Sequence, residues 1–163
     1  MNIRHTQLQD LDTVMEIYAA AREFMVATGN PRQWAARAWP PREKILADIE
    51  QGKSYVCVEG DEILAVFFYQ YGHDIDPTYR RIDDGNWIAG DTYGVVHRIA
   101  ARAGSGAGKF CINWAFSQCG HLRIDTHGDN RVMQKVLTDL GFTRCGIIYI
   151  EEDNDPRIAF EKV

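Results

Sequence analysis

A glycine-rich turn in the middle of the chain lies between an apolar strand pattern and a helix pattern. The apolar segment 95–101 runs directly into residues 102–109, which have glycine at alternate positions 104, 106 and 108. Glycine adopts backbone conformations that other residues avoid, and it places no Cβ in the way of an approaching ligand. The first N–H groups of a helix lack intrahelical partners and carry a partial positive charge. The pattern therefore predicts a strand, a tight turn and a helix whose N-terminus binds phosphate.

Composition limits the class of protein. The chain has 163 residues, of which 45% are hydrophobic and 25% charged, values typical of one globular domain spanning residues 1–163. It has no apolar run long enough to span a membrane and no signal-peptide pattern at its start, so we expect a cytoplasmic protein without a membrane partner. A net charge of −5 without a basic cluster argues against a nucleic-acid partner. The four cysteines are scattered, which favours reduced thiols.

Hydrophobic periodicity predicts alternating helices and strands. A strand is expected at 3–6, and a helix then begins near Asp10 or Asp12 and ends before Gly29. A second helix begins after Pro41 and ends at Gly52. Further strands are expected at 54–59, 62–71, 95–101, 122–126, 142–151 and 157–162, with helices at 108–118 and 130–140 and a long connection at 73–90. This order predicts an α/β fold with a mixed sheet.

A second motif follows the glycine-rich turn. The segment 130–142 reads N-R-V-M-Q-K-V-L-T-D-L-G-F and begins with an asparagine that can cap a helix. In order and spacing, this segment and the glycine-rich turn resemble the GNAT superfamily of acyl-CoA-dependent N-acetyltransferases along nearly the whole chain. The resemblance implies a single-domain α/β fold with a mixed, mostly antiparallel sheet flanked by helices on both faces. It also implies transfer of the acetyl group of acetyl-CoA to an amine of a small molecule or peptide, by direct attack in a ternary complex.

Two positions depart from the pattern of the superfamily. Ala103 occupies the position of a glutamine or arginine that precedes the first motif glycine, if Gly106 and Gly108 are the motif glycines. Leu137 occupies the position where many members have the tyrosine that protonates the departing thiolate. Tyr69, Tyr71 and Tyr149 are phenols that could replace this general acid.

The resemblance implies three groups of cofactor-binding residues. Backbone groups late in the strand would pair with the pantetheine arm and polarise the thioester carbonyl. Backbone amides of the turn would bind the phosphates, and Asn130 would contact the cofactor arm or act only as a helix N-cap. The expected residues are Ile99, Ala100, Ala101, Gly104, Ser105, Gly106, Ala107, Gly108, Lys109 and Asn130.

His97, Asp125 and Tyr149 are the expected catalytic residues. Two-residue alternation places His97 on one strand face with Val95, Ile99 and Ala101, and Arg98 on the opposite face. The imidazole is a candidate general base for the attacking amine, and a hydrogen-bonded core histidine is the alternative. Asp125 would hold the histidine tautomer or contact the amine, unless it only stabilises the turn that follows.

The acceptor site is expected in two loops. Gln33 and Trp34 lie between the first two helices, in the region that lines the acceptor cleft in the superfamily, and Trp87 lies in the long connection. Trp34 and Trp87 could form an apolar wall or simply cover the core. Tyr71 is assigned to the same site.

Alternative functions are a non-catalytic acyl-CoA-binding or regulatory module and a thioester hydrolase with Cys119 or Cys145 as nucleophile. No metal site is expected, because Cys119, His121 and His127 lack a known ligand spacing. The sequence leaves open the acceptor amine and the oligomeric state, including a homodimer.

Overall fold

The computed structural model describes residues 1–163, which form seven strands, four α-helices and three short 3-10 turns. The strands are β1 (Asn2–His5), β2 (Ser54–Glu59), β3 (Glu62–His73), β4 (Thr92–Ala101), β5 (Leu122–His127), β6 (Thr143–Tyr149) and β7 (Pro156–Lys162). The helices are α1 (Leu11–Ala27), α2 (Arg42–Glu50), α3 (Ala107–Cys119) and α4 (Arg131–Asp139), and the 3-10 turns are η1 (Leu8–Asp10), η2 (Ala35–Arg37) and η3 (Pro77–Arg80).

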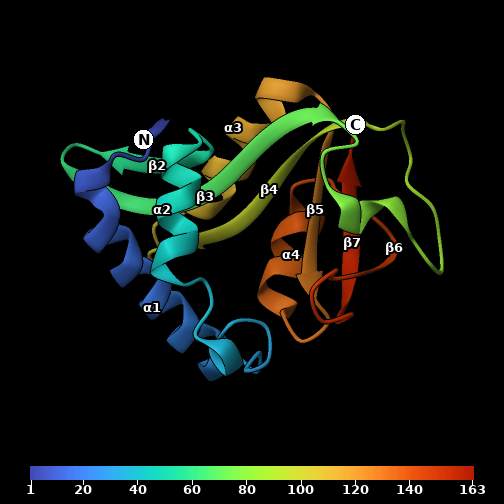
Figure 1. The fold of residues 1–163 in the computed structure, drawn as a ribbon, viewed down its shortest axis with the longest axis horizontal. Helices are drawn as coiled ribbons and strands as arrows, with labels where there is room; N and C mark the ends of the chain where they lie inside the picture. The colour runs from blue at the N-terminus through green and yellow to red at the C-terminus, as the bar shows by residue number, and fades with distance from the viewer.

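All seven strands belong to one sheet, in the order β1-β2-β3-β4-β5-β7-β6. Neighbouring strands are antiparallel except β4 and β5, which are parallel. Only two residue pairs join β4 to β5, Gly94 with Leu122 and Val95 with Arg123. Beyond these pairs the two strands diverge, as Figure 1 shows. The predicted α/β class, with a mixed and mostly antiparallel sheet, is confirmed.

Helices cover both faces of the sheet (Figure 1). On one face, α1 and α2 bury Val14, Ile17 and Ile45 against β2, β3 and β4. On the opposite face, a larger core includes residues of α3 and α4, among them Cys111 and the fully buried Leu137. Because each helix buries only one side, its apolar residues recur at helical spacing, which is the pattern that the sequence shows.

An extra residue in β4 interrupts its alternation at Arg98. Pairing advances two residues along β3, from Val66 to Phe68, but three along β4, from Ala100 back to His97. Arg98 has a φ of 50°, in the left-handed region. A bulge of this kind shifts the following side chains to the other face of the sheet.

The bulge brings consecutive side chains to one face. The ring of Phe68 lies 5.9 Å from the ring of His97 and 4.5 Å from the guanidinium of Arg98. Ile99 and Ala101 instead contact the core beneath α3. The expectation that His97 shares a face with Ile99 and Ala101, opposite Arg98, was therefore wrong, because simple alternation does not continue through a bulge.

The long connection between β3 and β4 is fixed to the sheet by a buried ion pair. Arg123 is 1% exposed, and its Nε lies 3.0 Å from Oε1 of the fully buried Glu161. The same guanidinium donates hydrogen bonds of 3.0 Å to the carbonyls of Ala89 and Gly90, and its carbon atom lies 4.2 Å from the ring centroid of Trp87. These contacts hold the connection in one position although it has few apolar residues.

None of the helices combines the length and the apolar composition that a membrane-spanning helix needs.

Candidate active site

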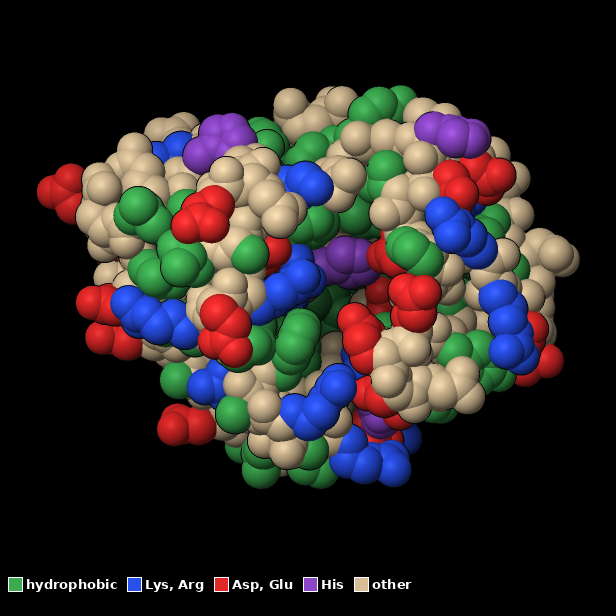
Figure 2. Space-filling model, viewed as in Figure 1, with side chains coloured by type: hydrophobic (Ala, Val, Ile, Leu, Met, Phe, Trp, Pro, Cys, Tyr) green, Lys and Arg blue, Asp and Glu red, His purple; other side chains and the backbone are tan.

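A cleft of about 430 Å³ opens where β4 and β5 diverge. Figure 2 shows it as a hollow near the middle of the visible face, with a histidine side chain inside it. The loop between α1 and α2 contributes Gln33 and Trp34 to the lining, β4 contributes His97, and β5 contributes Asp125 and Thr126. The divergence of two parallel strands therefore brings together side chains that lie far apart in sequence.

His97 lies between two carboxylates. Its Nε2 is 2.7 Å from Oδ2 of Asp76, and its Nδ1 is 3.9 Å from Oδ1 of Asp125. The hydroxyl of the buried Tyr79 donates a 2.6 Å hydrogen bond to Oδ1 of Asp125. Because an ionised carboxylate only accepts hydrogen bonds, Nε2 must carry the proton that it shares with Asp76. In the neutral imidazole, Nδ1 is then left as a proton acceptor facing Asp125.

Opposing effects act on the pKa values of the groups around His97. Burial acts to raise the pKa of Asp76, but the hydrogen bond with His97 and the bond from the Thr78 backbone N–H outweigh it, so the net pKa is lowered. Burial, with the nearby Asp125 carboxylate, raises the pKa of Tyr79 well above its usual value. Asp76 is therefore an anion at neutral pH, while Tyr79 keeps its proton for Asp125.

The β4 bulge is held by contacts from both helices on that face. The Arg98 guanidinium forms two hydrogen bonds with the carboxylate of the buried Asp48 on α2, at 2.9 and 3.1 Å. The Tyr18 hydroxyl, from α1, donates a 2.7 Å bond to the carbonyl of Arg98. These contacts stabilise the left-handed residue that places His97 in the cleft.

Asn130 links α4 to the loop between α1 and α2. Its Oδ1 accepts a 3.0 Å bond from the Met133 backbone N–H, so its amide nitrogen is the group that donates to Oε1 of Gln33 at 3.0 Å. Gln33 Oε1 also accepts a 2.9 Å bond from Asn30, which leaves the Gln33 NH₂ group as a free donor in a residue that lines the cleft. The N-cap alternative for Asn130 is thus present in the structure.

The turn before α3 has the open geometry of an anion site. Gly104 and Gly106 have φ values of 72° and 73°, and a Cβ at either position would meet nothing within 4 Å. The α3 helix begins at Ala107, one residue earlier than expected, with Gly106 as its N-cap. Ser105 accepts a 3.2 Å bond from the Ala107 backbone N–H and donates to the carbonyl of Arg102. The unhindered glycines and the next N–H groups of the helix, those of Gly108 and Lys109, suit a phosphate.

A buried, unpaired hydroxyl lies along the diverging strands. Thr126 is 1% exposed and lines the cleft, and its Oγ1 has no hydrogen-bond partner. A buried polar group without a partner is costly, so a ligand with amide groups fits this position. With only two residue pairs between β4 and β5, the sheet also leaves room for an extended polar chain. Together with the turn before α3, these features fit coenzyme A.

Among the expected cofactor-binding residues, Ile99 and Asn130 line the cleft, whereas Ala100, Ala101 and residues 104–109 do not. Three of the expected catalytic and acceptor-site residues also lie outside the cleft lining. The Tyr149 ring contacts the Arg81 guanidinium, with 4.7 Å from the guanidinium carbon to the ring centroid. Tyr71 is 52% exposed at the far end of β3. The Trp87 indole donates a 2.9 Å bond to the carbonyl of Tyr79 and covers Arg123. Leu137, the position of the missing tyrosine, is fully buried in the core.

Sequence reasoning missed the role of Asp76 and the hydrogen bond of Tyr79 to Asp125. Asp76 precedes Pro77 and accepts a 3.0 Å bond from the Thr78 backbone N–H, so the pair resembles an ordinary turn signal. The same carboxylate uses its second oxygen to bind His97. The position of the long connection over β4 brings Asp76 to the cleft lining and Tyr79 to Asp125.

The cysteines are not placed as nucleophiles. Cys145 is buried, and burial together with the Glu161 carboxylate raises the pKa of its thiol to about 11. The Cys119 thiol lies 3.3 and 3.2 Å from the backbone carbonyls of Ala115 and His121. A catalytic cysteine needs a lowered pKa and access to its substrate, so this geometry does not support the hydrolase alternative.

Comparison with solved structures shows similarity along the whole chain. An acetyltransferase of the GNAT family from Streptococcus agalactiae is 28% identical, with 99% of this chain and 94% of that chain covered and a TM-score of 0.89. A putative acetyltransferase from Staphylococcus aureus is 21% identical, with 99% and 98% covered and a TM-score of 0.69. A ribosomal-protein-alanine N-acetyltransferase from Brucella melitensis is 16% identical, with 100% and 99% covered and a TM-score of 0.65. The latter two share the fold. No protein-family model and no curated protein matches the chain.

Proposed function

From the confirmed resemblance to the GNAT superfamily, we propose that this protein transfers the acetyl group of acetyl-CoA to a primary amine of a small molecule or peptide. The observation that carries the proposal is His97, held between Asp76 and Asp125 inside the cleft that the diverging strands form. The free state of all four thiols supports a cytoplasmic location.

Proton removal from the acceptor is assigned to His97. The hydrogen bond to Asp76 keeps the proton on Nε2, so Nδ1 is the basic nitrogen. An amine between Nδ1 and Asp125 gives its proton to Nδ1, and the resulting imidazolium is stabilised by carboxylates on both sides. Tyr79 orients Asp125 by its hydrogen bond and acts as a positioning residue.

Acetyl-CoA, when bound, supplies the activated acetyl group. The residues that would hold it are the amides of the turn at Gly104 and Gly106, the late backbone of β4 at Ile99, and the unpaired Thr126 hydroxyl. Asn130 supports this side of the cleft by capping α4. A thiol has a pKa near 8.5, so a thiolate can leave without a dedicated acid, and the proposal does not depend on a replacement for Leu137.

The experiment is a transfer assay that measures thiol release from acetyl-CoA across an amine panel, together with calorimetry of coenzyme A binding. We expect His97→Ala to lower kcat by about 10²-fold or more, the usual contribution of a general base, with coenzyme A affinity unchanged. The control His73→Ala removes an exposed histidine outside the cleft, and Tyr149→Phe removes a phenol outside it; both should retain wild-type kcat. Coenzyme A binding without transfer to any amine would instead support the binding-module alternative.

A further inference from the structure

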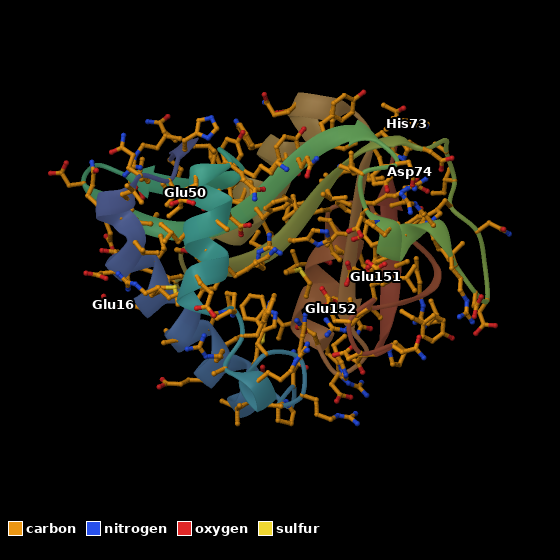
Figure 3. All side chains as sticks on the ribbon, in the orientation of Figure 1. Glu16, Glu50, His73, Asp74, Glu151 and Glu152 are labelled. Carbon is orange, nitrogen blue, oxygen red and sulfur yellow. The ribbon has the colours of Figure 1, made fainter.

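The walls of the cleft carry opposite charges. On the side of α2 and β2, the lining includes Lys44 and Lys53, and on the side of β5 and the β6–β7 turn it includes Asp125 and Glu152. Figure 3 labels Glu152 in the turn after β6, at the right-hand edge of the cleft. Figure 2 shows acidic side chains along the same rim.

The basic wall has an excess of positive charge. Lys44 and Lys53 are partly buried, and neither ammonium has a carboxylate within 4.0 Å or any hydrogen-bond partner in the protein. Asp48, the carboxylate of this wall, is already bound by both nitrogens of the Arg98 fork. Two cations that line a cleft without counter-charges favour an anionic group as their ligand.

The acidic wall has an excess of negative charge. Asp125 accepts a bond from the neutral Tyr79 hydroxyl, Asp76 is bound by His97, and Glu152 has no ion pair. Besides His97, two arginines line the cleft on this side, and each is paired with a carboxylate outside the lining. Arg157 Nε lies 3.1 Å from Asp155, and Arg37 Nη2 lies 3.2 Å from Asp153. Neither arginine forms an ion pair with Asp76, Asp125 or Glu152. A positively charged amine is therefore attracted to this wall, beside the basic nitrogen of His97.

We propose that the acceptor is an amine that also carries an anionic group, a carboxylate or a phosphate, bound by Lys44 and Lys53 while its amine faces His97 and Asp125. This inference rests on the proposed function and names its substrate class. A diamine would place its second cation against the basic wall, and a neutral amine would leave both lysines without a counter-charge. The opposed walls thus select a substrate by its charges at both ends.

The test uses three amine series of matched length: ω-amino acids of two to six carbons, the corresponding amino alcohols, and the corresponding diamines. Aminoalkyl phosphonates test whether the anionic group is a carboxylate or a phosphate-like group. The amides of alanyl-aspartate and alanyl-lysine test whether the acceptor is a free molecule or a peptide. We expect kcat/KM for the best anionic amine to exceed that of its alcohol by about tenfold or more, since a hydrogen bond to a charged group contributes on this scale.

Substitution of the two lysines tests whether they cause the preference for an anionic amine. Lys44→Gln and Lys53→Gln should each raise KM for the anionic amine about tenfold and leave the amino alcohol unaffected. Arg42→Gln is the matched control, because Arg42 lies on the same helix, is exposed, pairs with Asp12 and does not line the cleft. Equal kcat/KM across the three series, a preference for diamines, or an unchanged preference in both lysine variants would overturn the inference.

The experiments distinguish failure of the proposed acetyl transfer from failure of this inference. If no amine is acetylated, calorimetry of the ω-amino acids with the wild type and with Lys53→Gln still tests the charged walls directly. Binding that is lost in the variant supports the inference even then, and absence of binding to the wild type overturns it. Absence of coenzyme A binding would overturn only the proposed transfer.

Discussion

At the scale of single residues, Leu137 shows how a motif position and a structural position can differ. The superfamily resemblance suggests a tyrosine here that reaches the leaving thiolate, yet the Leu137 side chain is fully buried and contacts the core beneath the sheet. In this core Leu137 performs a packing role. The residues that the structure brings to His97 are Asp76 and Asp125, which come from the long connection and from β5.

We expect Leu137→Tyr to lower the free energy of unfolding by about 1–3 kcal/mol, because a larger ring must be accommodated in a filled core. Urea denaturation measures the change. Val132→Tyr is the control on the same helix, at a residue that is 43% exposed, and should change stability by less than about 0.5 kcal/mol. A Leu137→Tyr protein with wild-type stability and faster acetyl transfer would show that the ring reaches the cleft instead.

At the scale of elements, the start of α3 and the bulge in β4 have different structural roles. The glycines before α3 leave the helix N-terminus open, whereas the bulge at Arg98 turns two consecutive side chains toward the cleft. The turn is encoded locally by glycine. The bulge depends on contacts with Asp48 and Tyr18, which belong to different helices.

We expect Gly106→Asp to abolish most of the rise in melting temperature that coenzyme A produces, because the new carboxylate would repel a phosphate at the α3 N-terminus. For the wild type, ligand at 100 times its Kd should add about 2.7 kcal/mol of stability. Gly120→Asp is a matched control at the other end of α3, with a φ of 66° and nothing within 4 Å of an added Cβ. An equal loss of the coenzyme A effect in both variants would mean that the phosphates bind elsewhere.

At the scale of the whole molecule, three carboxylates with lowered pKa values fix segments to one another, and two of them, Asp76 and Glu161, join segments that are distant in sequence. A hydrogen bond from Arg4 lowers the pKa of Asp10. Burial acts to raise the pKa of Asp76, but its hydrogen bond with His97 outweighs this effect. Burial also acts to raise the pKa of Glu161, but its bonds with His121, the Ile88 N–H and Arg123 outweigh the effect there. A carboxyl group with a lower pKa in the folded state stabilises the fold above its unfolded pKa.

This stabilisation is lost as pH falls through the folded pKa values, so we expect the urea midpoint to decrease progressively below about pH 5. Asp76→Asn should show a shallower decrease than the wild type, because one of the contributing groups is absent. Asp61→Asn, at an exposed carboxylate without an ion-pair partner, is the control and should keep the wild-type slope. A midpoint that is constant between pH 5 and pH 3 would contradict this account.

The sequence was sufficient for the elements and for the fold class. Helical spacing of apolar residues predicts α1 and α2 to within a few residues, and strand β2 was predicted with the same bounds as in the structure. The glycine pattern at 104 and 106 predicts the turn before α3, because positive φ is a local property of the residue. His97 and Asp125 were recognised as candidates from their strands, and both line the cleft.

Only the tertiary structure decided which side chains face one another. The sequence placed Arg98 opposite His97, since alternation holds in a regular strand, but long-range contacts with Tyr18 and Asp48 stabilise a bulge that reverses it. Asp76 approaches His97 because contacts between distant segments hold the connection above β4, among them the Asp76 N–H bond to the Tyr93 hydroxyl and the packing of Trp87 on Arg123. Propensity and periodicity are local, so they determine elements, whereas the partners of a catalytic group depend on how distant segments pack together.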